Sequence, residues 1–310
     1  MEPRKTTGTN RILALVPAAI LLAGGSLARA ESPEAATTRA DIQKTLGFVP
    51  GFILRAPEAM LPGFWQELKG LEMNPHTALP GKYKELIGLA VAAQLPCRYC
   101  IYAHTAFARA NGASDEELRE AVGLAALARN TSTVLDGAQL DEPRFRAELA
   151  QLIAHAKQAR GQAPHPIAIV DAASTLEDIK QTMGIVPEFV RRIPAEALPG
   201  WWSSTKALQL SPASALPSKY KSLLGLAVAS QIPSWPCVAA DTELAKLAGA
   251  TDRELNEAVA MAGLVRTGSA LLNGLQIDEA SFRKDIDRVV GGGAKAGASR
   301  GHGHDASAQR

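Results

Sequence analysis

Two cysteines and a histidine stand close together in the segment Pro96-Cys97-Arg98-Tyr99-Cys100-Ile101-Tyr102-Ala103-His104. Cys97 and Cys100 are three residues apart, and His104 follows the second cysteine by four. On a helix this spacing places all three side chains on one face. The thiolate is the nucleophile in thiol chemistry, and both the positive end of a helix and a proton-accepting histidine favour it. The segment therefore predicts a thiol redox centre capable of peroxide chemistry.

The same residues permit other interpretations. A static disulfide is one, although a bridge between residues this close stabilises a protein little and is better suited to exchange. Zinc held by Cys97, Cys100, His104 and Glu85 is another, but structural zinc sites usually take their paired cysteines from a turn. Covalent haem attachment needs a histidine directly after the second cysteine, where this chain has Ile101. We therefore predict a redox pair that uses neither a metal nor an organic cofactor.

The first 30 residues have the three parts of a secretory signal peptide. Arg4, Lys5 and Arg11 precede or open an apolar run, and Ala28-Arg29-Ala30 stands directly before Glu31. The run is shorter than the roughly 20 residues of a membrane-spanning helix. We expect cleavage, no stable membrane insertion afterwards, and a periplasmic or secreted protein. The mature chain would carry 29 Lys and Arg against 30 Asp and Glu, which gives no indication of nucleic-acid binding.

The chain contains an internal duplication. A shift of 137 residues aligns residues 41–149 with 178–286 without a gap. Within it, KYKELIGLAVAA from Lys82 matches KYKSLLGLAVAS from Lys219 at nine of twelve positions. A length of 310 residues also fits about two domains. One ancestral domain has therefore been copied in tandem, and we refer to the copies as repeat 1 and repeat 2.

The duplication and the composition divide the chain into five parts. After the signal peptide (1–30) we expect a first domain over 31–160 and a second over 175–290. The segment 161–174 contains Pro164 and Pro166 and is the expected linker. Residues 291–310 are rich in Gly, Ala and Ser, which predicts a disordered tail.

The local signals within each repeat are helical. Ser114 with Glu117, and Thr251 with Glu254, fit the capping box ahead of long Ala/Leu/Val runs. Pro80 precedes a helical pattern over 82–94, and no convincing strand alternation is present. The sequence thus predicts an all-α fold made of two multihelical domains.

The region around the cysteines resembles a known family. Glu85 stands twelve residues before Cys97, and the motif CRYCIYAH is followed by Arg109, Gly112 and an acidic helix start. This pattern is similar to the AhpD-like alkylhydroperoxidase branch of the carboxymuconolactone decarboxylase superfamily. The resemblance is close in repeat 1, with repeat 2 as a degenerate copy. It implies a multihelical fold, thiol-dependent reduction of hydroperoxides and assembly from several copies of the domain.

The resemblance also implies roles for four residues. His104 and Glu85 would form a proton relay, Cys100 would attack the peroxide, and Cys97 would resolve the product as a disulfide. Elementary chemistry leaves one tension, because the helix dipole favours a thiolate at Cys97 whereas the one-turn spacing to His104 favours Cys100. We follow His104, since it can both accept the thiol proton and return one to the leaving alcohol.

Repeat 2 lacks this chemistry. The shift pairs Glu85, Cys97, Cys100 and His104 with, in order, Ser222, Ser234, Cys237 and Asp241. Without a second thiol or a histidine, Cys237 cannot complete a redox cycle, so we expect a buried thiol or a dead-end sulfenate there. Repeat 2 would then be structural and would pair with repeat 1 as a pseudo-dimer. Three such chains would assemble into a trimer.

Three functions remain open at this stage. The leading hypothesis is a peroxidase whose partners are a hydroperoxide substrate and an unidentified thiol reductant. The second is a thiol-disulfide oxidoreductase acting on protein substrates, and the third is a structural or binding module with an incidental disulfide. Decarboxylase activity is disfavoured, because the chain carries the paired-cysteine version of the motif.

Overall fold

The computed structural model describes residues 31–159 and 167–300, with side chains as far as residue 292. The predicted signal peptide, residues 161–166 of the predicted linker and the last ten residues of the predicted tail lie outside this part of the chain. The part that is described contains helices, turns and no strand. This confirms the expected all-α fold with two tandem helical domains. In the same residues, no helix combines the length and the hydropathy needed to cross a bilayer.

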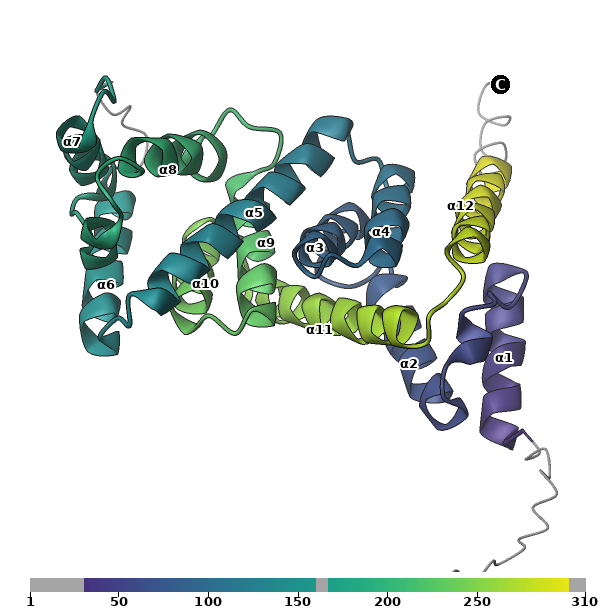
Figure 1. Ribbon diagram of the computed structural model, residues 1–310. Helices are drawn as coiled ribbons and strands as arrows, with labels where there is room; N and C mark the ends of the chain where they lie inside the picture. The colour runs from purple at the N-terminus through teal and green to yellow at the C-terminus, as the bar shows by residue number, and fades with distance from the viewer. Residues whose placement is uncertain (1–30, 160–166, 301–310) are drawn as a thin grey trace, which may run out of the picture.

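The two repeats contain matching helices, which Figure 1 labels in chain order. Repeat 1 contributes α1 (Pro33–Leu46), α2 (Leu61–Glu67), α3 (Gly81–Gln94), α4 (Arg98–Ala110), α5 (Asp115–Gly137) and α6 (Glu142–Gln158). Repeat 2 contributes α7 (Ala172–Met183), α8 (Leu198–Thr205), α9 (Ser218–Gln231), α10 (Trp235–Leu247), α11 (Asp252–Gly274) and α12 (Glu279–Arg300). Helix α7 begins inside the predicted linker, and α12 continues past the predicted start of the tail at Gly291.

Helix ends form where the sequence predicts them. Ser114 and Thr251 cap α5 and α11. In both helices the carboxylate of the glutamate three residues later accepts a hydrogen bond from the backbone N–H of the cap residue. Such reciprocal capping satisfies two otherwise unpaired backbone donors. Gly112 follows the end of α4 with a φ of 82°, a left-handed conformation that glycine adopts without strain. These signals fix where α4 ends and α5 begins.

A pseudo-twofold axis relates the repeats. Tyr83 and Tyr220 occupy equivalent positions, and their rings stack with centroids 3.2 Å apart at the contact between α3 and α9. Both helices are buried along most of their length, so the repeats meet through the most apolar element of each. The structure thus contains the pseudo-dimer expected from the duplication.

Carboxylates on the long helices repeat this symmetry. Glu120 of α5 accepts hydrogen bonds of 2.7 and 2.8 Å from the backbone of Ala215 and Leu216. Glu257 of α11 accepts two of 2.8 Å from Ala78 and Leu79. Each carboxylate reaches the loop before the central helix of the other repeat, where it satisfies two backbone donors. The inter-repeat contact is therefore specific as well as apolar.

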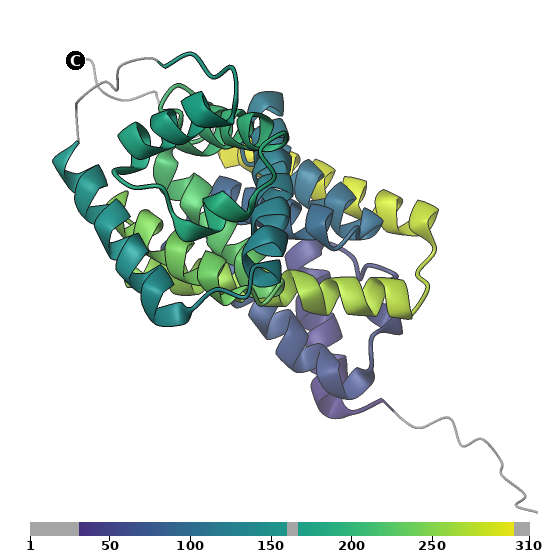
Figure 2. The same cartoon turned by 60° about the vertical axis from the view of Figure 1, so that its left-hand side comes forward.

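The long helices also exchange the ends of the repeats. In Figures 1 and 2, α5 and α11 cross between the repeats and carry α6 onto repeat 2 and α12 onto repeat 1. Helix α12 packs against α4, and α6 packs against α10. The largest hydrophobic cluster accordingly contains residues from both repeats. Each repeat therefore supplies two helices to the surroundings of the other repeat's site.

Candidate active site

The residues of the predicted site come from α3 and α4. Glu85 lies on α3, and His104 lies on α4 with its ring against Gly88 of α3. A Cβ at Gly88 would come within 2.5 Å of Nδ1 of His104. The ring thus occupies space that only glycine leaves open at this helix contact. The sequence places a glycine on α3 where α4 delivers its imidazole.

Cys97 and Cys100 form a disulfide at the start of α4, with their Cα atoms 5.3 Å apart. Cys97 is the N-cap residue, and its sulfur accepts a hydrogen bond of 3.3 Å from the backbone N–H of Cys100. The side chain of Cys97 is fully buried, whereas Cys100 is 4% exposed. The two sulfurs are therefore joined but occupy different surroundings.

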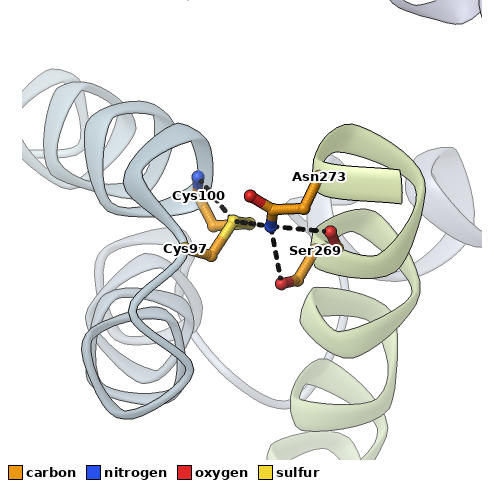
Figure 3. The surroundings of a disulfide bond; sticks show 4 residues. All are labelled: Cys97, Cys100, Ser269 and Asn273. Atoms are coloured by element: carbon orange, nitrogen blue, oxygen red, sulfur yellow. Dashed lines mark hydrogen bonds between the residues drawn. A yellow bond between two sulfur atoms is a disulfide. The ribbon is translucent and has the colours of Figure 1, made fainter. Parts of the chain in front are cut away.

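Repeat 2 supplies a further contact to Cys97. In Figure 3, Asn273 projects from α11 toward the disulfide, and its Nδ2 lies 3.5 Å from Sγ of Cys97. The same amide nitrogen donates to the carbonyl oxygen of Ser269 at 2.8 Å, which fixes its orientation. Sγ of Cys97 thus has two N–H donors, the side-chain amide of Asn273 and the backbone N–H of Cys100. Hydrogen bonds to a charged group stabilise it, so these donors would favour a thiolate at Cys97 once the disulfide is reduced. Cys97 thus contacts repeat 2.

His104 and Glu85 form a buried hydrogen-bonded pair. Nδ1 of His104 is 2.8 Å from Oε2 of Glu85, and both residues are buried. A second carboxylate, Glu72, places Oε1 3.8 Å from the same Nδ1. Lys84 positions this second carboxylate, because its buried ammonium binds the carbonyl oxygens of Leu71 and Asn74 on either side of it. The histidine is therefore held between two carboxyl groups.

Burial changes the acidity of all three groups. It raises the pKa of Glu85 to about 8. Burial, together with the charge of Glu85, raises the pKa of Glu72 to about 7. Burial lowers the pKa of His104, and the charge of Glu72 opposes that shift. The cluster therefore gains and loses protons near neutral pH, as a group that shuttles protons must.

A cavity of about 520 Å³ opens onto this cluster. Cys100, His104, Glu85 and Glu72 line it, and most of the remaining wall is apolar. Helices α11 and α12 of repeat 2 contribute part of that wall through side chains that include Leu264, Phe282 and Ile286. Cys97 is not among the lining residues, so a molecule in the cavity meets Cys100 first. An apolar cavity of about 150 Å³ already binds benzene, so this one has room for an alkyl or aryl molecule.

Comparison with protein families gives one clear match. The model of the carboxymuconolactone decarboxylase family matches residues 60–142 and 196–280, which together make up more than half of the chain. The chain belongs to this family. Both matched segments fall on equivalent helices of the two repeats, so each repeat is one family domain. The expectation drawn from the CRYCIYAH motif is confirmed at the level of the family.

Other comparisons add little to the family assignment. No curated protein matches the sequence. Among solved structures, the chain is similar to a protein of Burkholderia xenovorans LB400 described as a candidate gamma-carboxymuconolactone decarboxylase subunit. The identity is 19% and the TM-score 0.43, over 87% of this chain and 99% of the other. A similarity at this level supports no conclusion about activity.

The residues that could bind a metal ion are not the four that the zinc interpretation required. Cys97 and Cys100 are joined to each other, whereas Glu72, Glu85 and His104 place one ligand atom each within 4.8 Å of one another. Two carboxylates and an imidazole suit a divalent transition metal. Such an ion would have to replace the hydrogen bond between His104 and Glu85, so the observed geometry fits a proton relay better.

The family domain of repeat 2 keeps the framework of the site without its reactive groups. Asp241 takes the place of His104 and stands over Gly225, the counterpart of Gly88. Ser234 replaces Cys97, and its hydroxyl donates to Asp136 of α5 at 2.9 Å. Cys237 is buried, and its pKa is raised to about 12, mainly by that burial. At neutral pH this thiol is almost entirely protonated, which slows its reactions, and it has no partner cysteine beside it.

Three residues of the site escaped the sequence analysis of this family member. Glu72 lies outside the recognised motif, although its replacement by Gln209 in repeat 2 parallels the other losses and could have indicated it. Gly88 could have been noticed because Gly225 keeps it. Asn273 had no signal, because its contact with Cys97 depends on the crossing of α11 between the repeats. The four predicted residues do come together, as one disulfide and one hydrogen-bonded pair beside the same cavity.

Proposed function

We propose that the protein is a thiol-dependent peroxidase that reduces alkyl hydroperoxides or hydrogen peroxide at Cys100. One observation carries the proposal. The cysteine that lines an apolar cavity shares it with a buried His–Glu pair, while its disulfide partner does not line the cavity and contacts Asn273. On this basis we assign the attack to Cys100 and the resolution to Cys97.

The first half of the reaction takes place in the cavity. When Glu85 is ionised, its carboxylate accepts Nδ1–H of His104 and leaves the Nε2 lone pair free to take a proton. The Cys100 thiolate then attacks the terminal oxygen of the hydroperoxide, so that an S–O bond forms and the O–O bond breaks. The imidazolium returns its proton to the departing alkoxide, which leaves as an alcohol.

The second half restores the disulfide. Cys100 is now a sulfenic acid, and the Cys97 thiolate attacks its sulfur. An S–S bond forms and the S–O bond breaks, and the departing hydroxide takes up the proton that the Cys97 thiol gave up, so that water is released. Asn273 and the Cys100 backbone N–H, which contact Sγ of Cys97, are the donors available to stabilise the attacking sulfur in this step. An external dithiol then supplies two electrons and two protons to reopen the bridge.

Burial of the disulfide argues against protein substrates. Cys97 is fully buried and Cys100 is 4% exposed, so a folded partner cannot reach the sulfurs without local opening. A small hydroperoxide can reach Cys100 through the cavity. We therefore rank peroxidase activity above thiol-disulfide exchange with proteins and above an incidental structural bridge.

A steady-state assay tests the proposal. Peroxide loss is measured with cumene hydroperoxide, tert-butyl hydroperoxide and hydrogen peroxide, using dithiothreitol, dihydrolipoamide or thioredoxin as the reductant. Turnover that depends on enzyme and on thiol, and that survives EDTA, supports a metal-free thiol peroxidase. Absence of turnover with every pair, together with catalysed reduction of insulin disulfides, would establish the oxidoreductase instead.

The setting and the assembly belong to the same proposal. We propose, from the signal-peptide pattern of residues 1–30, that the mature protein acts in the periplasm or outside the cell, away from cytoplasmic lipoylated reductants. Expression with the native leader, followed by N-terminal sequencing, is expected to give a chain that starts at Glu31. Light scattering on that chain is expected to give a trimer of two-domain chains, and a monomer would contradict this part.

A further inference from the structure

Repeat 2 contains a cavity of its own at the position that corresponds to the active-site cavity. Its volume is about 170 Å³. Gln209, Cys237 and Asp241 line it, and they are the counterparts of Glu72, Cys100 and His104. Helices α5 and α6 of repeat 1 close it, just as α11 and α12 close the cavity of repeat 1. Repeat 2 therefore keeps a cavity lined by helices of both repeats, although it lacks the second cysteine and the histidine.

The walls of this repeat 2 cavity are almost entirely apolar. They include the side chains of Leu124, Phe145, Leu149, Phe189, Trp201 and Leu244. An apolar cavity without an occupant forfeits packing contacts along its lining. Cavities of about 150 Å³ with such walls bind benzene and exclude water. The size and the walls together indicate an organic molecule with an apolar body.

Two polar groups at the repeat 2 cavity have no partner. Asp241 makes no hydrogen bond within residues 31–159 and 167–292, and its carboxyl group stands over the bare backbone of Gly225. Trp201 also lines the cavity, and its Nε1–H is buried without an acceptor. Buried polar groups are normally hydrogen-bonded. The buried Nε1–H of Trp201, beside a half-buried Asp241 carboxyl group that has no hydrogen bond within the described residues, therefore points to a missing acceptor.

The charge state of the lining decides what that acceptor is. Burial raises the pKa of Asp241 to about 8, so at pH 7 the group is mostly a neutral carboxylic acid that can donate its proton. Glu148, at the same cavity, is already bound to the backbone N–H of Glu188 and paired with Arg144. An anion would meet that carboxylate without any free cation beside it. The fitting ligand is uncharged and offers one oxygen.

We infer that repeat 2 is a binding site for an uncharged aryl or short-chain alkyl compound bearing one hydroxyl or carbonyl oxygen, which accepts a hydrogen bond from the Asp241 carboxyl group. Its body fills the apolar chamber, and no bond is made or broken. The inference does not depend on peroxidase activity, because it concerns equilibrium binding at the other repeat.

Cys237 offers a direct readout of occupancy. It lines the cavity, and it is the single free thiol once Cys97 and Cys100 are joined. The experiment follows the slow methylthiolation of Cys237 in the oxidised full chain by methyl methanethiosulfonate at pH 7, which forms a mixed disulfide and releases methanesulfinate, at increasing concentrations of acetophenone. Cumene, which has an apolar body of similar size and no oxygen, is the matched compound. We expect saturable protection by acetophenone and protection at least fivefold weaker by cumene.

Variants locate the hydrogen bond. Asp241→Ala removes the donor and is expected to weaken protection by acetophenone about five- to tenfold, the usual scale for one hydrogen bond. Asp241→Asn keeps an N–H donor and is expected to stay within about threefold of wild type. His104→Ala, the matched change in repeat 1, is expected to leave protection unchanged.

Two results would overturn the inference. One is the absence of any protection by acetophenone in the wild-type chain, which means that the cavity does not bind such a compound. The other is equal protection in the wild type and in Asp241→Ala, which means that binding ignores the carboxyl group. Asp241→Asn guards against misfolding of the alanine variant, since an equally large loss in the asparagine variant would also contradict the proposed contact.

Discussion

The two repeats share a fold, a pseudo-twofold axis and a cavity, yet only repeat 1 retains a complete set of reactive groups. Glu85, Cys97 and His104 become Ser222, Ser234 and Asp241, while the framework glycines Gly88 and Gly225 are both present. The difference shows that the helical framework and the chemistry are separable. Burial encloses the hydrogen-bonded pair His104–Glu85 in repeat 1, and in repeat 2 it raises the pKa of Cys237 to about 12.

Repeat 2 also contributes to the candidate site of repeat 1. It provides α11 and α12 as part of the wall of the cavity that Cys100 lines, and it provides Asn273 beside Cys97. Repeat 1 in turn contributes α5 and α6 to the wall of the repeat 2 cavity, and its Asp136 accepts a hydrogen bond from Ser234. Neither site is made from one repeat alone, so loss of chemistry in repeat 2 does not free it from its structural role.

The largest expected effect comes from replacing each cysteine of the disulfide with serine. Cys100→Ser is expected to abolish peroxide turnover, because the serine hydroxyl does not ionise near neutral pH. Cys97→Ser is expected to permit a single oxidation, which traps a sulfenic acid on Cys100. Dimedone labelling followed by mass spectrometry checks both. Label on Cys97 in Cys100→Ser, with none on Cys100 in the converse variant, reverses the assignment.

A smaller loss is expected from filling the space against the catalytic histidine. Gly88→Ala places a Cβ 2.5 Å from Nδ1 of His104, so the ring must move away from Glu85. We expect turnover to fall about 10²-fold, the scale for losing a general acid–base group. The matched control is Gly225→Ala, which crowds Asp241 at 2.7 Å in repeat 2 and is expected to leave turnover near wild type. Equal losses in the two variants would mean that His104 has no special role.

Replacement of the buried carboxylate is expected to change the pH profile. The rate of Cys100 oxidation in the wild type should rise with pH through about 8, where Glu85 ionises. Glu85→Gln is expected to remove that rise and to cost less activity than His104→Ala. Stopped-flow oxidation between pH 5 and 9 measures the profile. An unchanged inflection in the variant would assign it to another group.

Glu85→Gln is also expected to change how the free energy of unfolding depends on pH. The pKa of Glu85 is raised from 4.5 to about 8 in the folded protein. Its contribution to the free energy of unfolding is therefore fully present below about pH 4.5 and is lost as the pH rises through about 8. Urea unfolding is expected to show that Glu85→Gln gains on the wild type between pH 6 and pH 9.

The smallest effect is expected at the contact between the repeats. Asn273→Asp puts a carboxylate beside Cys97, as Asp136 stands beside Ser234. The charge disfavours the Cys97 thiolate and hence the reduced pair. We expect the reduction potential to become more negative by about 30 mV, which is a tenfold change in the exchange equilibrium. Glutathione titration measures it, with Asp136→Asn as the control that should not change it.

Much of this structure could be predicted from the sequence. The capping boxes, the 137-residue shift and the spacing of Glu85, Cys97, Cys100 and His104 are local or periodic signals, and they gave the helices, the duplication and the core of the site. Glu72 and Asn273 could not be found in that way. Their roles arise from a bend of the chain held by Lys84 and from the crossing of α11 between the repeats, which no short-range pattern records.

The central claim is that thiol chemistry resides in repeat 1 alone, and peroxide stoichiometry tests it most directly. The full-length protein is reduced, freed of reductant under anaerobic conditions and mixed with excess cumene hydroperoxide, and the alcohol formed per chain is measured. The account predicts one equivalent of alcohol per chain, a Cys97–Cys100 disulfide and an unmodified Cys237 by mass spectrometry. No alcohol, or rapid oxidation of Cys237 at a rate matching that of Cys100, would contradict it.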